Sequence, residues 1–295
     1  MKSYIEAIDK TRPITVGDNN PNGLQNANTQ EFRNKVSTVL AKNGEGLAGA
    51  NYSMGSMAGI HKTHPDWKII ATESASPSNS RGIYNTLSQY NKTGDYQCTA
   101  YDTNAVSWGN TARESWWYTI KDDFVSGEFI WTGFDYIGEP TPWNGTDKGS
   151  VSGDKLAVPN SSYFGVIDTA GFEKDSFYFY TSQWREDKKT LHVVPQSWNA
   201  EDLSISGGKV PVYVYSNAAK VELYLNDKLI GTSTRTPITT AAGHEWATYS
   251  NVSNDADQCT AVNESHQWKA QAIQFNVKYA EGTLSAKAYD ESGNE

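Results

Sequence analysis

The sequence predicts an α/β domain followed by an all-β domain. Up to about residue 184, strand-like runs alternate with stretches of helical spacing, and after about residue 192 apolar and polar residues alternate with a period of two. A short charged stretch at 185–189 separates the two patterns. We therefore expect one domain over residues 1–187 and a second over residues 188–295.

The alternation in the first domain indicates parallel strands joined by crossover helices. The run KIIATES at 68–74 is short, apolar and partly β-branched, as in a strand that is covered on both faces. In chain order, the pattern predicts a helix at 3–11, a strand at 13–20, a helix at 29–46, strands at 47–55 and 68–74, a helix at 110–127 and a strand at 127–139.

The second domain has the pattern of an antiparallel, immunoglobulin-like β-sandwich. Asn-Asp and glycine-rich turns separate its period-two runs. These runs lie at 191–199, 210–217, 220–231, 272–279 and 282–290. The last run ends where a further strand is expected, so we expect the sandwich to be truncated at its C-terminus.

Composition limits the classes of function. The net charge is −9 and the pI about 5.1, which argues against a nucleic-acid surface because phosphate binding needs clustered Lys and Arg. No apolar run is long enough to span a bilayer. The 10 Trp and 17 Tyr are typical of carbohydrate sites, where rings pack against sugars, and a large core would explain them equally well.

Polar and aromatic residues end several of the predicted strands. Asn51 and Tyr52 follow one strand, Glu73 ends the next, and Trp131 and Asp135 end the last. No glycine-rich phosphate loop follows any of these strands. Such side chains at the carboxyl ends of successive parallel strands are typical of the catalytic face of a (β/α)₈ barrel.

Three stretches carry a family resemblance: TESASPSNSRG at 72–82, GEFIWTGFDYIGEPTPW at 127–143 and SSYFGVIDTAGFEKDSFYFYTSQW at 161–184. They resemble the β-galactosidases of glycoside hydrolase family 2, most closely the multidomain bacterial members. The run VPVYVYSNAAKVELYLNDKLIG at 210–231 extends the resemblance into the second domain. It implies strands five to eight of a (β/α)₈ TIM barrel, followed by the β-sandwich.

The resemblance also implies that the chain is a fragment. The family's general acid/base is the Glu of an Asn-Glu pair at the end of barrel strand four, and no such pair precedes the predicted strand at 13–20. The N-terminal half of the parent enzyme would be the partner that completes the site. We expect the isolated chain to be inactive or nearly so, and the open edges of a half-barrel favour oligomerisation.

The resemblance assigns roles to individual residues. Glu73 corresponds to the nucleophile of a retaining glycosidase, which attacks the anomeric carbon, and Tyr52 would orient that carboxylate with its hydroxyl group. Trp131 corresponds to the platform under the sugar. Further candidates for substrate binding are Asn51, Arg81, Asp135, Glu139 and Trp143. Arg81 would pair with Asp135 or Glu139, or else tie two loops together.

No cofactor and no metal are expected. His61 and His64 have a spacing that zinc ligands can have, but no carboxylate or Cys partner is suggested nearby. The compartment of the bacterial parent stays open, either cytoplasmic or exported.

Three functions remain open. The first is cleavage of terminal non-reducing β-D-galactose from β-galactosides. The second is a β-glucuronidase or another specificity of the family, although Asn144 and Lys148 lie four residues apart and not two, as a glucuronidase's Asn-x-Lys would require. The third is a non-catalytic carbohydrate-binding or structural module, which fits the sandwich but not the stretch around Glu73.

Overall fold

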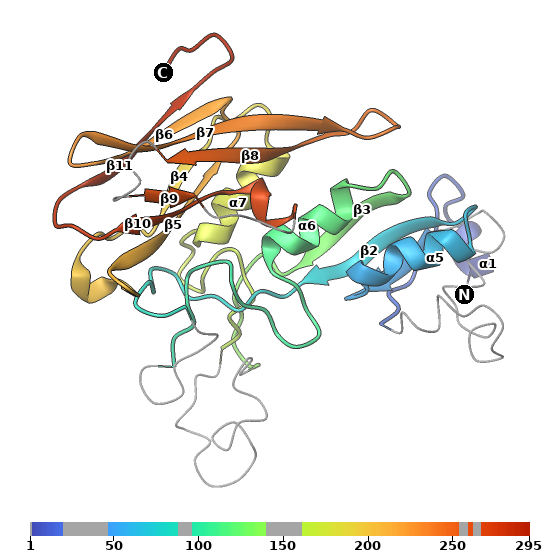
Figure 1. Ribbon diagram of the computed structural model, residues 1–295. Coiled ribbons are helices and arrows are strands. Elements are labelled where there is room, and N and C mark those ends of the chain that lie inside the picture. Colours follow the sequence, from blue (N-terminus) through green and yellow to red (C-terminus); the bar gives the residue numbers. More distant parts are fainter. Residues whose placement is uncertain (1, 20–46, 88–95, 140–160, 254–258, 262–266) are drawn as a thin grey trace, which may run out of the picture. The chain divides into compact units, whose positions relative to one another are not determined.

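The computed structural model describes residues 2–19, 47–87, 96–139, 161–253, 259–261 and 267–295 (Figure 1). The chain forms two compact units. Unit 1 consists of Met1–Ala75, Ser115–Trp131 and Thr240–His244, and unit 2 of Ser76–Glu114, Thr132–Thr239 and Glu245–Glu295. The chain passes several times between the units, whereas the predicted domains meet once, near residue 187, and that boundary stays a prediction.

A three-stranded parallel sheet forms the centre of unit 1. Its order is β1-β2-β3, with β1 at Leu47–Asn51, β2 at Lys68–Ala75 and β3 at Val125–Trp131. The parallel pairing agrees with the strand and helix alternation of the sequence. Because all three strands run in one direction, their carboxyl ends lie at the same edge of the sheet.

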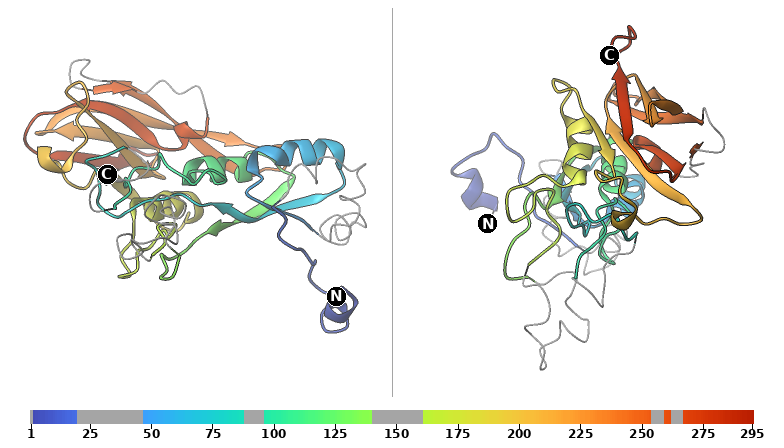
Figure 2. Two further views of the ribbon diagram at one scale, coloured as in Figure 1. Left: turned by 90° about the horizontal axis from the view of Figure 1, so that it is seen from below. Right: turned by 90° about the vertical axis from the view of Figure 1, so that its left-hand side faces the viewer.

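Short helical segments precede the first of these strands or connect one strand to the next in the chain. They are α1 at Lys2–Glu6, the 3₁₀ turn η1 at Met54–Ser56, α5 at Met57–Thr63 and α6 at Ala112–Ile120. Helix α5 packs on one face of the sheet (Figure 2). There, buried Met57 and Ile60 meet small and aliphatic side chains of β1 and β2. No helix in the described ranges is both long and apolar enough to cross a membrane.

Two predictions for the first 46 residues have different outcomes. The segment predicted as a strand at 13–20 has one isolated bridge, at Ile14, in its described part, so that prediction is wrong. The segment nevertheless runs beside β1, where Asn51 N donates to Asp18 O at 2.8 Å. Among the described residues, the isolated bridge and this bond do not extend into a continuous ladder. The helix predicted at 29–46 lies outside the described residues.

Gly49 permits the close approach of this segment to β1. A Cβ atom at Gly49 would lie 2.0 Å from the carbonyl oxygen of Val16. We expect Gly49→Ala to lower the free energy of unfolding by about 1–3 kcal/mol, the usual cost of overpacking. Urea denaturation would measure it.

Gly55→Ala is the matched control in the same unit. Its Cβ atom would meet nothing closer than the Tyr118 hydroxyl at 3.7 Å, so we expect a change within about 0.5 kcal/mol. Equal stabilities of the two variants would contradict the close approach at Gly49.

Unit 2 contains the predicted β-sandwich. Its sheets have the orders β4-β5-β10-β9 and β11-β6-β7-β8, with antiparallel pairing throughout. Aliphatic and aromatic side chains of both sheets form one buried cluster, as the period-two pattern requires. The strands are β4 Leu191–Val194, β5 Lys209–Ser216, β6 Lys220–Leu225, β7 Lys228–Thr239, β8 Glu245–Ser253, β9 Cys259–Ala261, β10 Ile273–Lys278 and β11 Leu284–Tyr289.

Several details of the sandwich differ from the prediction. The run at 220–231 is a hairpin of β6 and β7 and not one strand, because Asn226 and Asp227 adopt positive φ angles of 52° and 61° and turn the chain. The long β7–β8 hairpin and β9 were not predicted. The remaining elements of unit 2 are α7 at Asp175–Trp184 and the 3₁₀ turns η2 at Ala200–Asp202 and η3 at Lys269–Gln271.

Candidate active site

Glu73 lies near the carboxyl end of β2, the central strand of the sheet in unit 1. It is half-buried and stands opposite Asn51 of β1. The main-chain N–H of Tyr52 donates to the carbonyl oxygen of Glu73 at 2.9 Å. The structure thus joins Glu73 and Tyr52 through the backbone, and the predicted contact between their side chains stays a prediction.

A β-bulge occurs in β2 at Thr72, directly before Glu73. From Ile70 to Glu73, β2 advances three residues while β1 advances two, from Gly49 to Asn51. On the other side, β2 advances three residues from Ala71 to Ser74 while β3 advances two. The extra residue therefore lies in β2 itself, and bulges next to active sites re-aim a side chain.

Backbone strain accompanies the bulge. Tyr52, Ala75 and Ser76 have φ angles of 48°, 62° and 68°, although none of them is glycine. A non-glycine residue with positive φ is uncommon and costs free energy. Tyr52 follows the last residue of β1, Ala75 is the last residue of β2, and Ser76 follows it. These three residues mark this edge of the sheet as a candidate functional site.

Two other predicted residues lie at the same edge. The amide oxygen of Asn51 accepts a hydrogen bond from Thr72 Oγ1 at 2.5 Å, which fixes the Asn51 side chain beside the bulge. Trp131 ends β3 opposite Ala75 and is 36% exposed. The structure therefore brings Asn51, Tyr52, Glu73 and Trp131 together within unit 1.

Glu128 of β3 was missed by the sequence reasoning. Its Oε2 atom accepts hydrogen bonds from Ser74 Oγ at 2.8 Å and Ser115 Oγ at 2.7 Å. Burial raises the pKa of this carboxyl above its ordinary value. A Glu within a run of strand residues was a possible signal, but no partner for its carboxyl group could be identified from the sequence.

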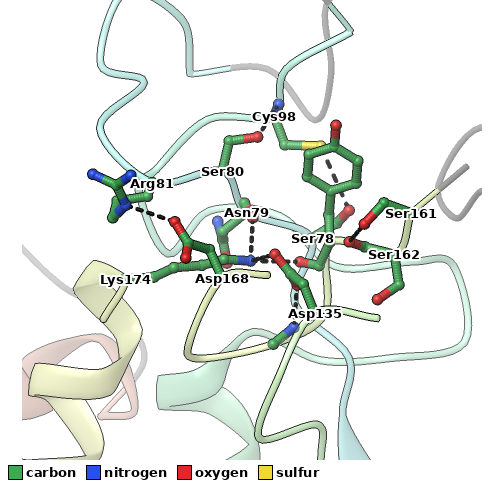
Figure 3. Close-up of polar contacts among 12 residues, drawn as sticks. Ser78, Asn79, Ser80, Arg81, Cys98, Asp135, Ser161, Ser162, Asp168 and Lys174 are labelled. Carbon is green, nitrogen blue, oxygen red and sulfur yellow. Dashed lines mark hydrogen bonds and ion pairs between the residues drawn. The ribbon is translucent and has the colours of Figure 1, made fainter. Parts of the chain in front are cut away.

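In unit 2, Arg81 pairs with a residue that was not predicted. Its Nε atom lies 2.7 Å from Asp168 Oδ2 (Figure 3). Its guanidinium group lies 4.8 Å from the ring centroid of Phe172. The two pairings considered for Arg81, with Asp135 or Glu139, do not form. Arg81 instead ties the loop after β2 to the 168–172 turn, which agrees with its alternative role as a link between loops.

Asp135 is engaged by a buried lysine. Lys174 Nζ lies 2.6 Å from Asp135 Oδ2, and the side chains are 2% and 7% exposed. Lys174 also donates to Asn79 O at 2.8 Å, and Asp135 Oδ1 accepts from Gly165 N at 2.7 Å (Figure 3). Both Asp135 oxygens are thus engaged. No pattern in the sequence pointed to Lys174, because Lys is rarely buried.

The remaining predicted residues are less informative. Glu139 accepts a hydrogen bond from the Tyr136 hydroxyl group. Trp143 lies outside the described residues. His61 and His64, with their zinc-like spacing, each stack on an aromatic ring, at centroid distances of 4.1 Å from Phe124 and 3.8 Å from Trp67.

A pocket of about 320 Å³ lies elsewhere in unit 2, at one end of the sandwich. Its walls include Leu191, Ala218, Ala288 and Tyr289, and it contains none of the predicted site residues. It therefore does not bear on the candidate site.

The relatives of the chain are glycosidases. It is 35% identical to the β-galactosidase BoGH2A of Bacteroides ovatus over 243 residues, which are 78% of this chain and 25% of that protein. It is 32% identical to a putative β-glucuronidase of Formosa agariphila over 193 residues, 65% of this chain and 14% of that protein. The chain therefore spans about a quarter or less of the length of these relatives.

Solved structures show the same fold. A β-glycosidase from Bacteroides vulgatus matches with a TM-score of 0.65 at 22% identity, over 99% of this chain and 32% of that one. A glycosyl hydrolase family 2 member from Bacteroides cellulosilyticus matches with a TM-score of 0.54 at 21% identity, over 99% of this chain and 30% of that one.

Residues 207–295 match the family described as Domain of unknown function (DUF4982).

Proposed function

Because this chain is homologous to glycoside hydrolase family 2 enzymes and spans about a quarter of its β-galactosidase relative, we propose that it supplies the nucleophile of a retaining glycosidase. The single observation that carries the proposal is the bulge directly before Glu73 on the central parallel strand. The parallel order β1-β2-β3 supports reading these strands as six, seven and eight of a (β/α)₈ barrel. Residues 13–18, beside β1, take the place of strand five.

In the proposed reaction, an oxygen of the Glu73 carboxylate forms a bond to the anomeric carbon while the glycosidic C–O bond breaks. The leaving oxygen takes a proton from a second carboxylic acid about 5–5.5 Å from Glu73. That second group then removes a proton from water, which displaces Glu73 and releases the sugar. We propose that it comes from the part of the barrel that precedes this chain in its relatives.

The other residues position the sugar. Trp131 provides an aromatic surface at the end of β3, and Tyr52 orients the Glu73 carboxylate. Asn51, Arg81 and Glu139 remain proposed polar contacts. Asp135 is better explained as the partner of Lys174, since both of its carboxylate oxygens are already engaged.

We propose β-D-galactosides as the substrates. The relative with 35% identity is a β-galactosidase, whereas the relative with 32% identity is a putative β-glucuronidase. The spacing of Asn144 and Lys148, four residues apart, favours galactose over glucuronic acid. Because glucuronides are the alternative from the same family, both sugars belong in the test.

A covalent trap tests the proposal. A 2-deoxy-2-fluoro-β-galactoside with a dinitrophenolate leaving group needs little protonation to react, and its fluorine destabilises the transition state of hydrolysis, so the glycosyl-enzyme accumulates. Incubated with the full-length enzyme that contains residues 1–295, it should label the peptide that carries Glu73, as mass spectrometry would detect.

The glucuronic acid analogue and the Glu73→Gln variant complete the experiment. We expect neither to give a labelled peptide. Labelling by the glucuronic acid analogue alone would identify glucuronides, not galactosides, as the substrates. Labelling at another carboxylate would refute the role of Glu73. Binding of galactose without any labelling would favour the non-catalytic module.

A further inference from the structure

Glu128 connects two elements of unit 1 that the sequence separates. It lies on β3, and its Oε2 atom accepts hydrogen bonds from Ser74 on β2 and Ser115 on α6. Ser74 Oγ also lies 3.3 Å from the carbonyl oxygen of Phe129. The carboxyl group of Glu128 therefore links β3 to Ser74 of β2 and to Ser115 of α6.

The position of this carboxyl group is unfavourable by itself. Its second oxygen, Oε1, is buried and has no hydrogen-bond partner among the residues that the structure describes. No Lys, Arg or His of the described chain forms an ion pair with it. A buried polar group with an unsatisfied atom costs free energy. Leu or Met would avoid that cost but would also remove the acceptor that the Ser74 and Ser115 hydroxyl groups share.

The bond to Ser74 suggests what the glutamate does. Ser74 directly follows Glu73 and is the last residue of the β2 bulge, where the ladder to β3 resumes opposite Ile130. The bulge leaves Thr72, next to Glu73, without a ladder partner on either side. The direction of the Glu73 side chain therefore depends on how the residues around the bulge are held. Ser74 is 0% exposed, and the Glu128 carboxyl group accepts the hydrogen bond of its hydroxyl group.

We propose that Glu128 is a positioning residue that aims Glu73, acting through the hydroxyl group of Ser74. The inference rests on the proposed function of Glu73 as the nucleophile. Glu128 touches no reacting atom in this scheme. It holds the end of β2 through the hydrogen bond from Ser74. Displacement of a reacting group by about 1 Å can cost roughly 100-fold in rate.

Four variants of the full-length enzyme test this inference with an aryl β-galactoside. Glu128→Leu and Ser74→Ala should each lower kcat about 10- to 100-fold while KM changes less than about threefold. Glu128→Gln keeps an oxygen acceptor of the same reach, so its kcat should stay within about threefold of the wild type. The double variant, Glu128→Leu with Ser74→Ala, should be no slower than Glu128→Leu alone, because both remove the same restraint.

Ser182→Ala is the control for loss of a buried serine hydroxyl. Ser182 is 8% exposed, lies on α7 and donates to Phe179 O at 2.7 Å. This variant should lower the melting temperature and leave kcat unchanged. A purely structural Glu128 would make Ser74→Ala behave in the same way.

The outcomes separate this inference from the proposal on which it depends. If the fluorosugar fails to label Glu73 in the wild type, the proposed function fails. If Glu73 is labelled but Ser74→Ala retains the wild-type kcat, the positioning role is overturned, even if Glu128→Leu does not fold. Rate losses that multiply in the double variant would also overturn it.

Discussion

Glu73→Gln is expected to lower kcat/KM for an aryl β-galactoside roughly 10⁴- to 10⁶-fold in the full-length enzyme that contains this chain, because it removes the nucleophile that we propose. This loss corresponds to about 5–8 kcal/mol of transition-state stabilisation. The amide has nearly the same shape as the carboxylate, so the fold should be unchanged. Steady-state kinetics with purified protein would measure the effect.

The control for this prediction is Glu201→Gln. Glu201 is an exposed residue of η2 in unit 2, and its replacement should leave the kinetics unchanged. Glu73→Ala with added azide gives a second readout, because azide can enter the vacated space and attack the anomeric carbon. The product should then be an α-galactosyl azide, formed with a single inversion. A Glu73→Gln enzyme within tenfold of the wild type would refute the assignment.

Arg113→Met is expected to lower the free energy of unfolding by about 3–5 kcal/mol, because it removes one partner of a buried ion pair. Arg113 and Asp102 are each 2% exposed, and Nε lies 2.9 Å from Oδ2. Asp102 also accepts hydrogen bonds from the N–H groups of Ala112 and Arg113 at the start of α6. Without the guanidinium group, the Asp102 carboxylate would be buried without a cation.

Arg113 makes further contacts that the variant would lose. Its Nη1 atom donates to Lys269 O at 3.2 Å, and the guanidinium group lies 4.8 Å from the ring centroid of Tyr213. Denaturation by urea, followed by tryptophan fluorescence, would measure the change. The double variant with Asp102→Asn should recover part of the loss, since it removes the unpaired charge.

Arg235→Met is the matched control in the same unit. Arg235 Nη2 lies 2.9 Å from Glu245 Oε1, but the two side chains are 25% and 53% exposed. An exposed pair at the same distance contributes about 0–1 kcal/mol, because water and side-chain entropy offset the attraction. A loss for Arg113→Met no larger than that for Arg235→Met would contradict the role of burial.

The sequence by itself determined the elements whose pattern is local. Period-two alternation gave the sandwich, because each strand has one buried face whatever its partner is. The apolar run before Glu73 gave β2, and its polar end marked the candidate site. The motifs around Glu73 and Trp131 gave the family resemblance, which the β-galactosidase and β-glucuronidase relatives support.

The tertiary structure alone decided the contacts that join distant parts of the chain. The bulge directly before Glu73 is a difference in register between β2 and both its neighbours, so no single strand encodes it. Ser74 and Glu128 are 54 residues apart, and Arg81 and Asp168 are 87 apart. Hydrophobic periodicity fixes which side of an element is buried, but it does not say which buried polar groups meet. Those pairings follow from strand order, register and loop path, which depend on residues far apart in the chain.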